Sequence, residues 1–369
     1  MTSWMRYVAG GLVVVALILL FALPVLAARY AENEAALAWL RQSREPDGGF
    51  PTGFAAGSDF GTTAEVILAV AAAGQDVSTW DSAEGLSPLD YVASQVASGQ
   101  VSDVGNLSKA VLVAVATGQN PRDFGGVDLI NQLLAQQDST TGMFGDTLFK
   151  HAYAVLALRN AGAGVPASAV TAMTSQFTED GAWALFGGTT PGTADTNTTA
   201  LVMQALVAVG RPDAAAGALP YLRRMQNEDG GFPYQKPSAW GTETDANSTA
   251  VVLQALYALD EPLGQWVASG TDPLGALLAL WDEESGAYLW QASTPFPNML
   301  ATAQAVQAGE GMTLVDVATV GASRAPQTEG APTSTAPLLP ASGGIAGSLV
   351  LVGAGLALLG TGGLLRRRS

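Results

Sequence analysis

The chain has 369 residues, of which 48% are hydrophobic and 13% are charged, and its formal net charge is -16. This length suits one large domain with tails. The acidic excess repels phosphate backbones and argues against nucleic acid as a partner. Cysteine is absent, which excludes disulfides, thiolate metal ligands and a cysteine nucleophile.

Residues 1–27 have the pattern of a secretory signal peptide. Arg6 precedes an apolar run from Val8 to Leu23, and Val25-Leu26-Ala27 supplies a small-residue cleavage site before Ala28. The apolar run is nearly long enough to cross a bilayer, so an uncleaved N-terminal membrane anchor is the alternative. We expect the following residues to lie outside the cytoplasm.

Residues 28–315 are predicted to form one domain of about six helix-turn-helix repeats. The first helix of each repeat is expected at Ala36–Gln42, Leu89–Gln95, Ile130–Gln137, Val170–Phe177, Tyr221–Gln226 and Leu277–Trp281. In five repeats a turn with glycine follows and ends in an aromatic residue: Phe50, Phe144, Trp183, Phe232 or Tyr288. The second helix is expected at Thr62–Ala73, Leu107–Thr117, Lys150–Leu158, Asn197–Val209, Asn247–Leu259 and Met299–Val306.

The second helices define the period of the repeat. We align them on Ala64, Ala110, Ala152, Ala200, Ala250 and Ala303, which gives steps of 46, 42, 48, 50 and 53 residues. Self-similarity at this period indicates a repeat architecture in which each unit buries its apolar face on its neighbours.

The two helices of a repeat differ in polarity. The second helices are apolar nearly all round, which is typical of helices buried on most sides. The first helices carry polar residues such as Arg41, Arg223 and Arg224. We therefore predict an all-α fold, an (α/α)6 toroid with the second helices inside and the first helices outside. Glycine permits the tight turn between them, and the aromatic residue is expected to fold back as an apolar plug.

Two further segments follow the domain. Residues 316–338 are rich in Pro, Thr, Ser and Ala and are predicted to form a stalk. In residues 339–369, Leu339-Pro340-Ala341-Ser342-Gly343 precedes an apolar run from Ile345 to Leu365 and the arginines at 366–368. This pattern resembles a bacterial sortase sorting signal, with Ser342 in the usual place of threonine.

The apolar run is long enough to span a bilayer, and the arginines hold its end in the cytoplasm. The expected partners are thus the bilayer, a sortase and the cell wall, and the expected location is the bacterial cell surface. A sortase would cut between Ser342 and Gly343. Without cleavage, the apolar helix remains as the anchor.

The repeat motifs resemble those of the terpenoid cyclase and protein prenyltransferase α/α-toroid superfamily. The similarity covers about 280 residues and is carried by the turn Gln226–Phe232 and by the helix starts Asp195–Ala200 and Asp245–Ala250. It implies that the N-terminal ends of the inner helices line a ligand cavity. The ligand-binding residues predicted on this basis are His151, Asp195, Asn197, Trp240, Asp245, Asn247 and Asn298.

The chemistry of the superfamily is not retained. Squalene-type cyclases carry an Asp-x-Asp-Asp-Thr-Ala pattern whose central aspartate protonates the alkene, and here Asn197 and Asn247 stand in that place. A carboxamide has no proton to give at an accessible pKa. Prenyltransferases hold zinc with Asp, Cys and His, and the single histidine, His151, lies out of order without a cysteine. We therefore predict no catalytic residue, metal or cofactor. The expected function is binding of a small hydrophobic or cobalamin-like ligand or of a cell-surface partner.

Several alternatives remain open. Asp195, Asn197, Asp245 and Asn247 could serve only as helix caps. His151 could be a base, a metal ligand or a structural residue. Asp195 and Asp245 could instead form the carboxylate pair of a divergent cyclase, transferase or glycan-active enzyme. Trp183, Trp240 and Trp290 could stack on a ligand or pack in the core. The domain could also be a purely structural adhesion module.

Overall fold

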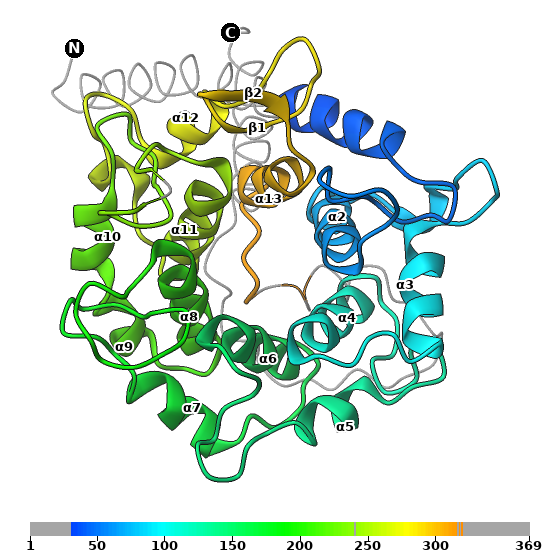
Figure 1. Cartoon of the computed structure of the whole chain (residues 1–369), viewed down its shortest axis with the longest axis horizontal. Coiled ribbons are helices and arrows are strands. Elements are labelled where there is room, and N and C mark those ends of the chain that lie inside the picture. Colours follow the sequence, from blue (N-terminus) through cyan, green and yellow to red (C-terminus); the bar gives the residue numbers. More distant parts are fainter. Residues whose placement is uncertain (1–30, 240, 316, 318, 320–369) are drawn as a thin grey trace, which may run out of the picture. The chain divides into compact units, whose positions relative to one another are not determined.

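A computed structural model describes residues 31–239, 241–315, 317 and 319 (Figure 1). The predicted signal peptide, the predicted sorting signal and nearly all of the predicted stalk lie outside these residues. Among the described residues, no helix combines the length and hydrophobicity needed to cross a bilayer.

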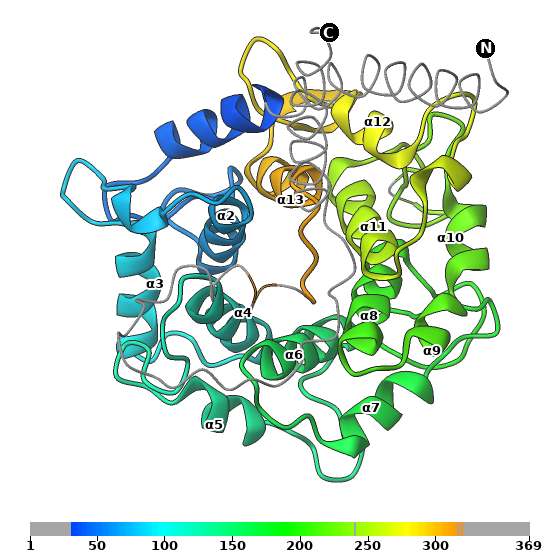
Figure 2. The same ribbon diagram turned by 180° about the vertical axis from the view of Figure 1, so that it is seen from behind.

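Six helices form an inner ring. They are α2 (Phe60–Ala72), α4 (Val104–Ala116), α6 (Leu148–Asn160), α8 (Thr196–Ala208), α11 (Ala246–Ala258) and α13 (Met299–Gly309). Each packs against the next, and α13 packs against α2, so the ring closes (Figures 1 and 2). The apolar second helices therefore lie inside, as predicted, and surround the centre of the ring, which we call the lumen (Figure 1).

The outer layer contains shorter helices. These are residues 31–42, α3 (Pro88–Ala97), α5 (Leu129–Leu134), α7 (Ala167–Thr174), α9 (Pro212–Ala216), α10 (Leu219–Met225) and α12 (Pro273–Leu278). Two 3-10 turns, η1 (Val77–Thr79) and η2 (Leu263–Gln265), join this layer. The sequence did not predict α9, and it placed the start of α12 four residues too late. Helix α12 begins at Pro273 because Asp272 accepts a hydrogen bond from the Gly275 N–H (2.8 Å) and proline suits the first helical position.

Each inner helix follows a capping residue. The caps are Asp59, Asp103, Thr147, Asp195, Asp245 and Asn298, so consecutive repeats are 44, 44, 48, 50 and 53 residues apart. In this register Ser108, not Ala110, is equivalent to Ala64. The sequence alignment was therefore wrong by two residues in the second repeat, because alanine is frequent in every inner helix and does not fix a register.

One element departs from the all-α prediction. Strands β1 (Leu289–Gln291) and β2 (Thr294–Pro297) form an antiparallel hairpin between α12 and α13. The sequence did not predict this hairpin, because its strands are short and β2 contains two prolines. Prolines are confined to sheet edges, and β2 is an edge strand that pairs only with β1.

The aromatic residues after the glycine turns are buried plugs, as predicted. Phe50, Phe144, Trp183, Phe232 and Tyr288 are each at most 1% exposed. In each case the backbone N–H donates to a side chain of the following inner helix, namely Thr63, His151, Thr199, Thr249 or Thr302. The acceptor always lies four residues after the cap. Each repeat thus fastens its turn to its own inner helix.

Candidate functional site

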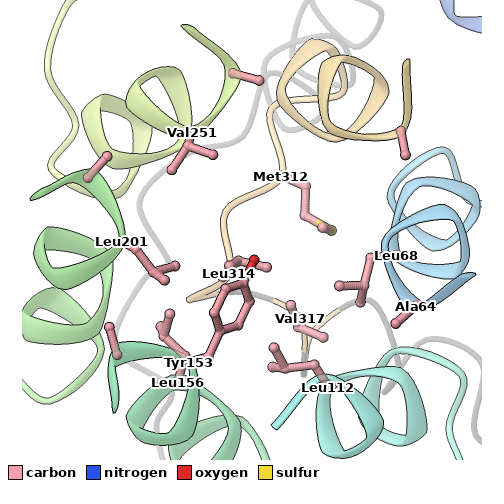
Figure 3. Close-up of a cluster of buried hydrophobic side chains, with 14 of the residues drawn as sticks. Ala64, Leu68, Leu112, Tyr153, Leu156, Leu201, Val251, Met312, Leu314 and Val317 are labelled. Atoms are coloured by element: carbon pink, nitrogen blue, oxygen red, sulfur yellow. The ribbon is translucent and has the colours of Figure 1, made fainter. Parts of the chain in front are cut away.

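The lumen is lined by equivalent positions of the inner helices. Residues two, six and nine positions after each cap share one helix face, because helical neighbours recur every three or four residues. Figure 3 shows side chains from this face, including Leu68, Leu112, Leu156 and Leu201, gathered in the lumen. We call the end of the lumen at the N-terminal ends of the inner helices the mouth.

The chain itself fills the lumen below the mouth. After α13 the backbone turns at Gly311 and enters the ring, where Met312 and Leu314 are buried (Figures 2 and 3). The Leu314 N–H donates to Gln204 Oε1 (2.9 Å), and Asn160 Nδ2 donates to the Leu314 carbonyl (2.7 Å). Side chains of α6 and α8 therefore hold this segment, which we call the lumen plug (residues 311–315).

A charged network lies above the lumen plug. Glu65 is 1% exposed, and its Oε1 accepts hydrogen bonds from Lys109 Nζ (2.9 Å) and the Tyr153 hydroxyl (3.0 Å). Its Oε2 accepts from Gln307 Nε2 (3.0 Å). Burial raises the pKa of Glu65, but the Lys109 charge and these hydrogen bonds outweigh it and lower the pKa below its usual value. Burial and the Glu65 charge raise the pKa of Tyr153. Glu65 therefore stays ionised and Tyr153 stays neutral.

Two of the predicted asparagines reach the lumen face. Asn197 and Asn247 lie two residues after their caps and are half-buried. Asn247 Nδ2 donates to Gln304 Oε1 (2.9 Å), and Gln304 holds the position in α13 that Glu65 holds in α2. Asn298 instead caps α13, since its Oδ1 accepts from the Ala301 N–H (2.9 Å). The mouth is therefore lined on this side by amide groups.

Asp195 and Asp245 are both buried caps of neighbouring inner helices. The Oδ1 atom of each accepts a hydrogen bond of 2.7 Å, from the Thr198 N–H and the Ser248 N–H respectively. Burial raises the pKa of each carboxyl to about 6. The loop at 232–234 contacts both caps, because the Thr196 N–H donates to the Tyr234 carbonyl (2.9 Å) and the Asp245 N–H donates to the Phe232 carbonyl (3.1 Å).

His151 lies away from the lumen face. It is fully buried, its Nδ1 accepts from the Phe144 N–H (2.9 Å), and its Nε2 lies 2.9 Å from the Ala169 carbonyl, to which it donates. Burial lowers the pKa of the ring, which keeps it neutral. His151 thus fills the place that threonine has in four other repeats, and both its nitrogens are engaged within the protein. Trp240, the remaining predicted residue, lies outside the described residues.

Comparison with known proteins bears on the fold. Neither a protein-family model nor a curated protein matches the chain. Among solved structures, the type II terpene cyclase MstE from Scytonema is 14% identical, with 79% of this chain and 99% of that chain covered and a TM-score of 0.55. Haptocorrin in complex with Cbi is 15% identical over 79% of this chain and 68% of that chain, with a TM-score of 0.52. A protein from Actinoplanes is 14% identical over 77% and 99%, with a TM-score of 0.53.

The chain has the α/α-toroid fold of these proteins. The identities are low, so the similarity extends to the fold and not to an activity.

A groove lies where the toroid closes, between its first and last repeats. It has a volume of about 530 Å³ and is lined by Trp39, Ser43, Pro51, Thr52, Gly53, Phe54, Trp290, Thr294, Phe296, Pro297, Asn298 and Met299. We call it the seam groove. Phe54 is 88% exposed and Phe296 is 71% exposed, and none of the lining residues is ionisable. Of these residues, only Trp290 and Asn298 could be identified as candidates from the sequence, because the groove combines segments more than 230 residues apart.

Proposed function

We propose that the protein is a non-catalytic toroid, displayed outside the cell, that binds a ligand at the mouth of its lumen. Two residues support the absence of cyclase chemistry. Asn197 and Asn247 stand where a general acid would be needed, and both carry carboxamides on the lumen face.

The observation that carries the proposal is the lumen plug. Met312 and Leu314 occupy the space that an enclosed apolar substrate would need (Figure 3). Close packing leaves no room for a second apolar chain beside them. A ligand therefore binds above the plug, against the face that carries Asn197, Asn247 and Gln304.

The groups at the mouth favour a particular kind of ligand. Amide side chains both donate and accept hydrogen bonds, so they suit neutral ligands with amide or hydroxyl groups. Lys109, the cation on the lumen face of α4, is already paired with Glu65, with 2.9 Å between Nζ and Oε1. A corrinoid or a fragment of the cell wall fits this chemistry better than an isoprenoid diphosphate, whose charge would find no free cation among these residues.

Display outside the cell is supported by the two ends of the sequence. The signal-peptide pattern before Ala28 and the sorting-signal pattern from Leu339 both predict export. Two measurements would test this: detection of the labelled protein in the cell-wall fraction, and digestion of the domain when intact cells are treated with protease. A domain that stays undigested on intact cells would contradict export.

Ligand screening of the intact chain tests the binding proposal. Its thermal unfolding is measured with corrinoids, soluble cell-wall fragments and isoprenoid diphosphates, and turnover is measured for each ligand that stabilises the protein. We expect stabilisation without turnover, and loss of stabilisation in Asn247→Ala. Turnover of any ligand would contradict the non-catalytic proposal.

One observation favours an enzyme as the second candidate. Asp195 and Asp245 have pKa values raised to about 6, which suits proton transfer near neutral pH. A glycan-active enzyme using this pair would lose its turnover in Asp195→Asn, whereas a binding protein would retain its ligand affinity.

A further inference from the structure

The seam groove presents an unusual set of polar groups. Trp39 and Trp290 line it, and neither indole N–H has a hydrogen-bond partner among the described residues. The Asn298 Oδ1 is committed to the Ala301 N–H, which leaves its Nδ2 donor available. The Thr52 hydroxyl oxygen accepts from the Phe54 N–H (3.2 Å), so its own proton is also available. The groove therefore offers hydrogen-bond donors.

The lack of charged residues in the groove further restricts the kinds of ligand that fit it. The chain carries 48 charged residues, 16 basic and 32 acidic, yet none of those that the structure describes lines the groove. A charged ligand would lose its hydration there without gaining a counter-charge. The ligand is thus uncharged and has flat apolar faces that can pack on the four aromatic rings. It carries hydrogen-bond acceptors and has few hydrogen-bond donors of its own.

We propose that the seam groove binds an uncharged, proline-rich peptide in the polyproline II conformation. Proline has a carbonyl acceptor and no N–H donor, so its hydrogen-bonding needs match the donors of the groove. Its ring offers an apolar face, and its extended helix is preformed, which lowers the entropic cost of binding. Aromatic-lined grooves are a known solution for such peptides.

The shape of the groove supports the same ligand. Phe54 comes from the loop at 51–54 in the first repeat and Phe296 from β2 in the last repeat, while Trp39 belongs to the helix at 31–42 and Met299 to α13. Exposed aromatic residues from both ends of the chain at a groove of this volume are suited to contact with the apolar faces of an extended chain. The seam groove shares no lining residue with the amide face of the mouth, which carries Asn197, Asn247 and Gln304.

A peptide-binding measurement on the intact chain tests this inference. The probe is a dye-labelled, N-acetylated and C-amidated peptide of four Ala-Pro-Pro units, and fluorescence anisotropy follows its binding. We expect saturable binding that weakens at least tenfold in Trp290→Ser and in Phe296→Ser. The Kd should change less than twofold between 50 and 500 mM salt, because no charge takes part.

Two controls make the test specific. Phe186 is 79% exposed on the loop between α7 and α8, away from the seam, and Phe186→Ser should leave the Kd within twofold. A peptide with every proline replaced by alanine should bind at least tenfold more weakly. The proposal is overturned by absence of saturable binding, by equal effects of Phe186→Ser and Phe296→Ser, by equal binding of the alanine peptide, or by loss of binding at high salt. None of these results bears on turnover or on ligands at the mouth.

Discussion

The two halves of the inner ring place their polar side chains at different depths of the lumen. Six residues after the caps, α2, α4 and α6 carry Glu65, Lys109 and Tyr153, whereas α8, α11 and α13 carry Leu201, Val251 and Gln304. Nine residues after the caps, the first half carries Leu68, Leu112 and Leu156, and the second half carries Gln204, Gln254 and Gln307. The order of polar and apolar layers is thus inverted between the halves.

This inversion lets one network join the two halves. Gln254 Nε2 donates to Gln307 Oε1 (3.3 Å), and Gln307 Nε2 donates to Glu65 Oε2 (3.0 Å). Since Gln307 is on α13 and Glu65 is on α2, the network crosses the point where the ring closes. Equivalent positions of a repeat fold can therefore differ in polarity between the halves, and polar side chains of the two halves still hydrogen-bond to each other where the ring closes.

Removing the centre of the network should have the largest effect. Glu65→Ala leaves Lys109 without its buried partner, and breaking such a pair costs about 3–5 kcal/mol of unfolding free energy. Urea denaturation of both proteins at pH 7 measures the difference. Because the folded pKa of Glu65 is lowered, its contribution is present above the unfolded pKa and is lost as the pH falls through the folded pKa.

A surface ion pair supplies the control for this experiment. Lys150 Nζ lies 2.8 Å from Asp146 Oδ1, but both side chains are exposed. Lys150→Ala should therefore change stability by less than about 1 kcal/mol. Equal losses in Glu65→Ala and Lys150→Ala would show that the network contributes no more than a surface pair.

The buried caps of the second half should make stability depend on pH. The folded pKa of Asp195 is raised to about 6 from a usual 3.8, so the protein loses stability as the pH rises through this window. Asp195→Asn keeps a capping oxygen, as Asn298 does in α13, and removes the titration. We expect the change in unfolding free energy caused by Asp195→Asn to be more favourable at pH 7 than at pH 4, by on the order of 2 kcal/mol. Denaturation curves at both pH values measure this, and an unchanged pH dependence would contradict it.

A smaller effect is expected from making the second half resemble the first. Gln204→Leu introduces the leucine found at the equivalent position of α2, α4 and α6 and leaves the Leu314 N–H without an acceptor. The loss of stability is limited, because the substitution also removes the Gln204 Nε2, which is buried without a hydrogen-bond partner in the described structure. We expect a loss of about 1 kcal/mol in unfolding free energy. A gain in stability would show that the hydrogen bond to the lumen plug is dispensable.

The fold could be predicted because its signals are local and repeated. Turns such as Asp229-Gly230-Gly231-Phe232 need glycine where the structure has a φ of 91° at Gly230, and a side chain there would meet the Thr271 carbonyl at 2.5 Å. The apolar inner helices recur with the same order. These features identify the toroid before any long-range contact is known.

The lumen could be predicted only in part. His151 looks chemically special in isolation, and its structural role shows only when the caps set the register and place it with Thr63 and Thr199. Glu65, Lys109 and Tyr153 are spaced 44 residues apart, so the same register would have grouped them. The alignment on alanine hid this spacing. Nothing local in residues 311–315 indicates that they enter the ring, because that depends on space left by five other helices.

The lumen plug also determines how the domain bears tension. Leu314 is joined through its backbone to Asn160 and Gln204, which lie on the side of the ring opposite the α13–α2 junction. A force applied to the chain beyond Val315 would therefore act on these two hydrogen bonds before it reached α13. It does not peel α13 away from its neighbours one hydrogen bond at a time. The hydrogen bonds of the plug would break first, while the helices of the closed ring were still packed together.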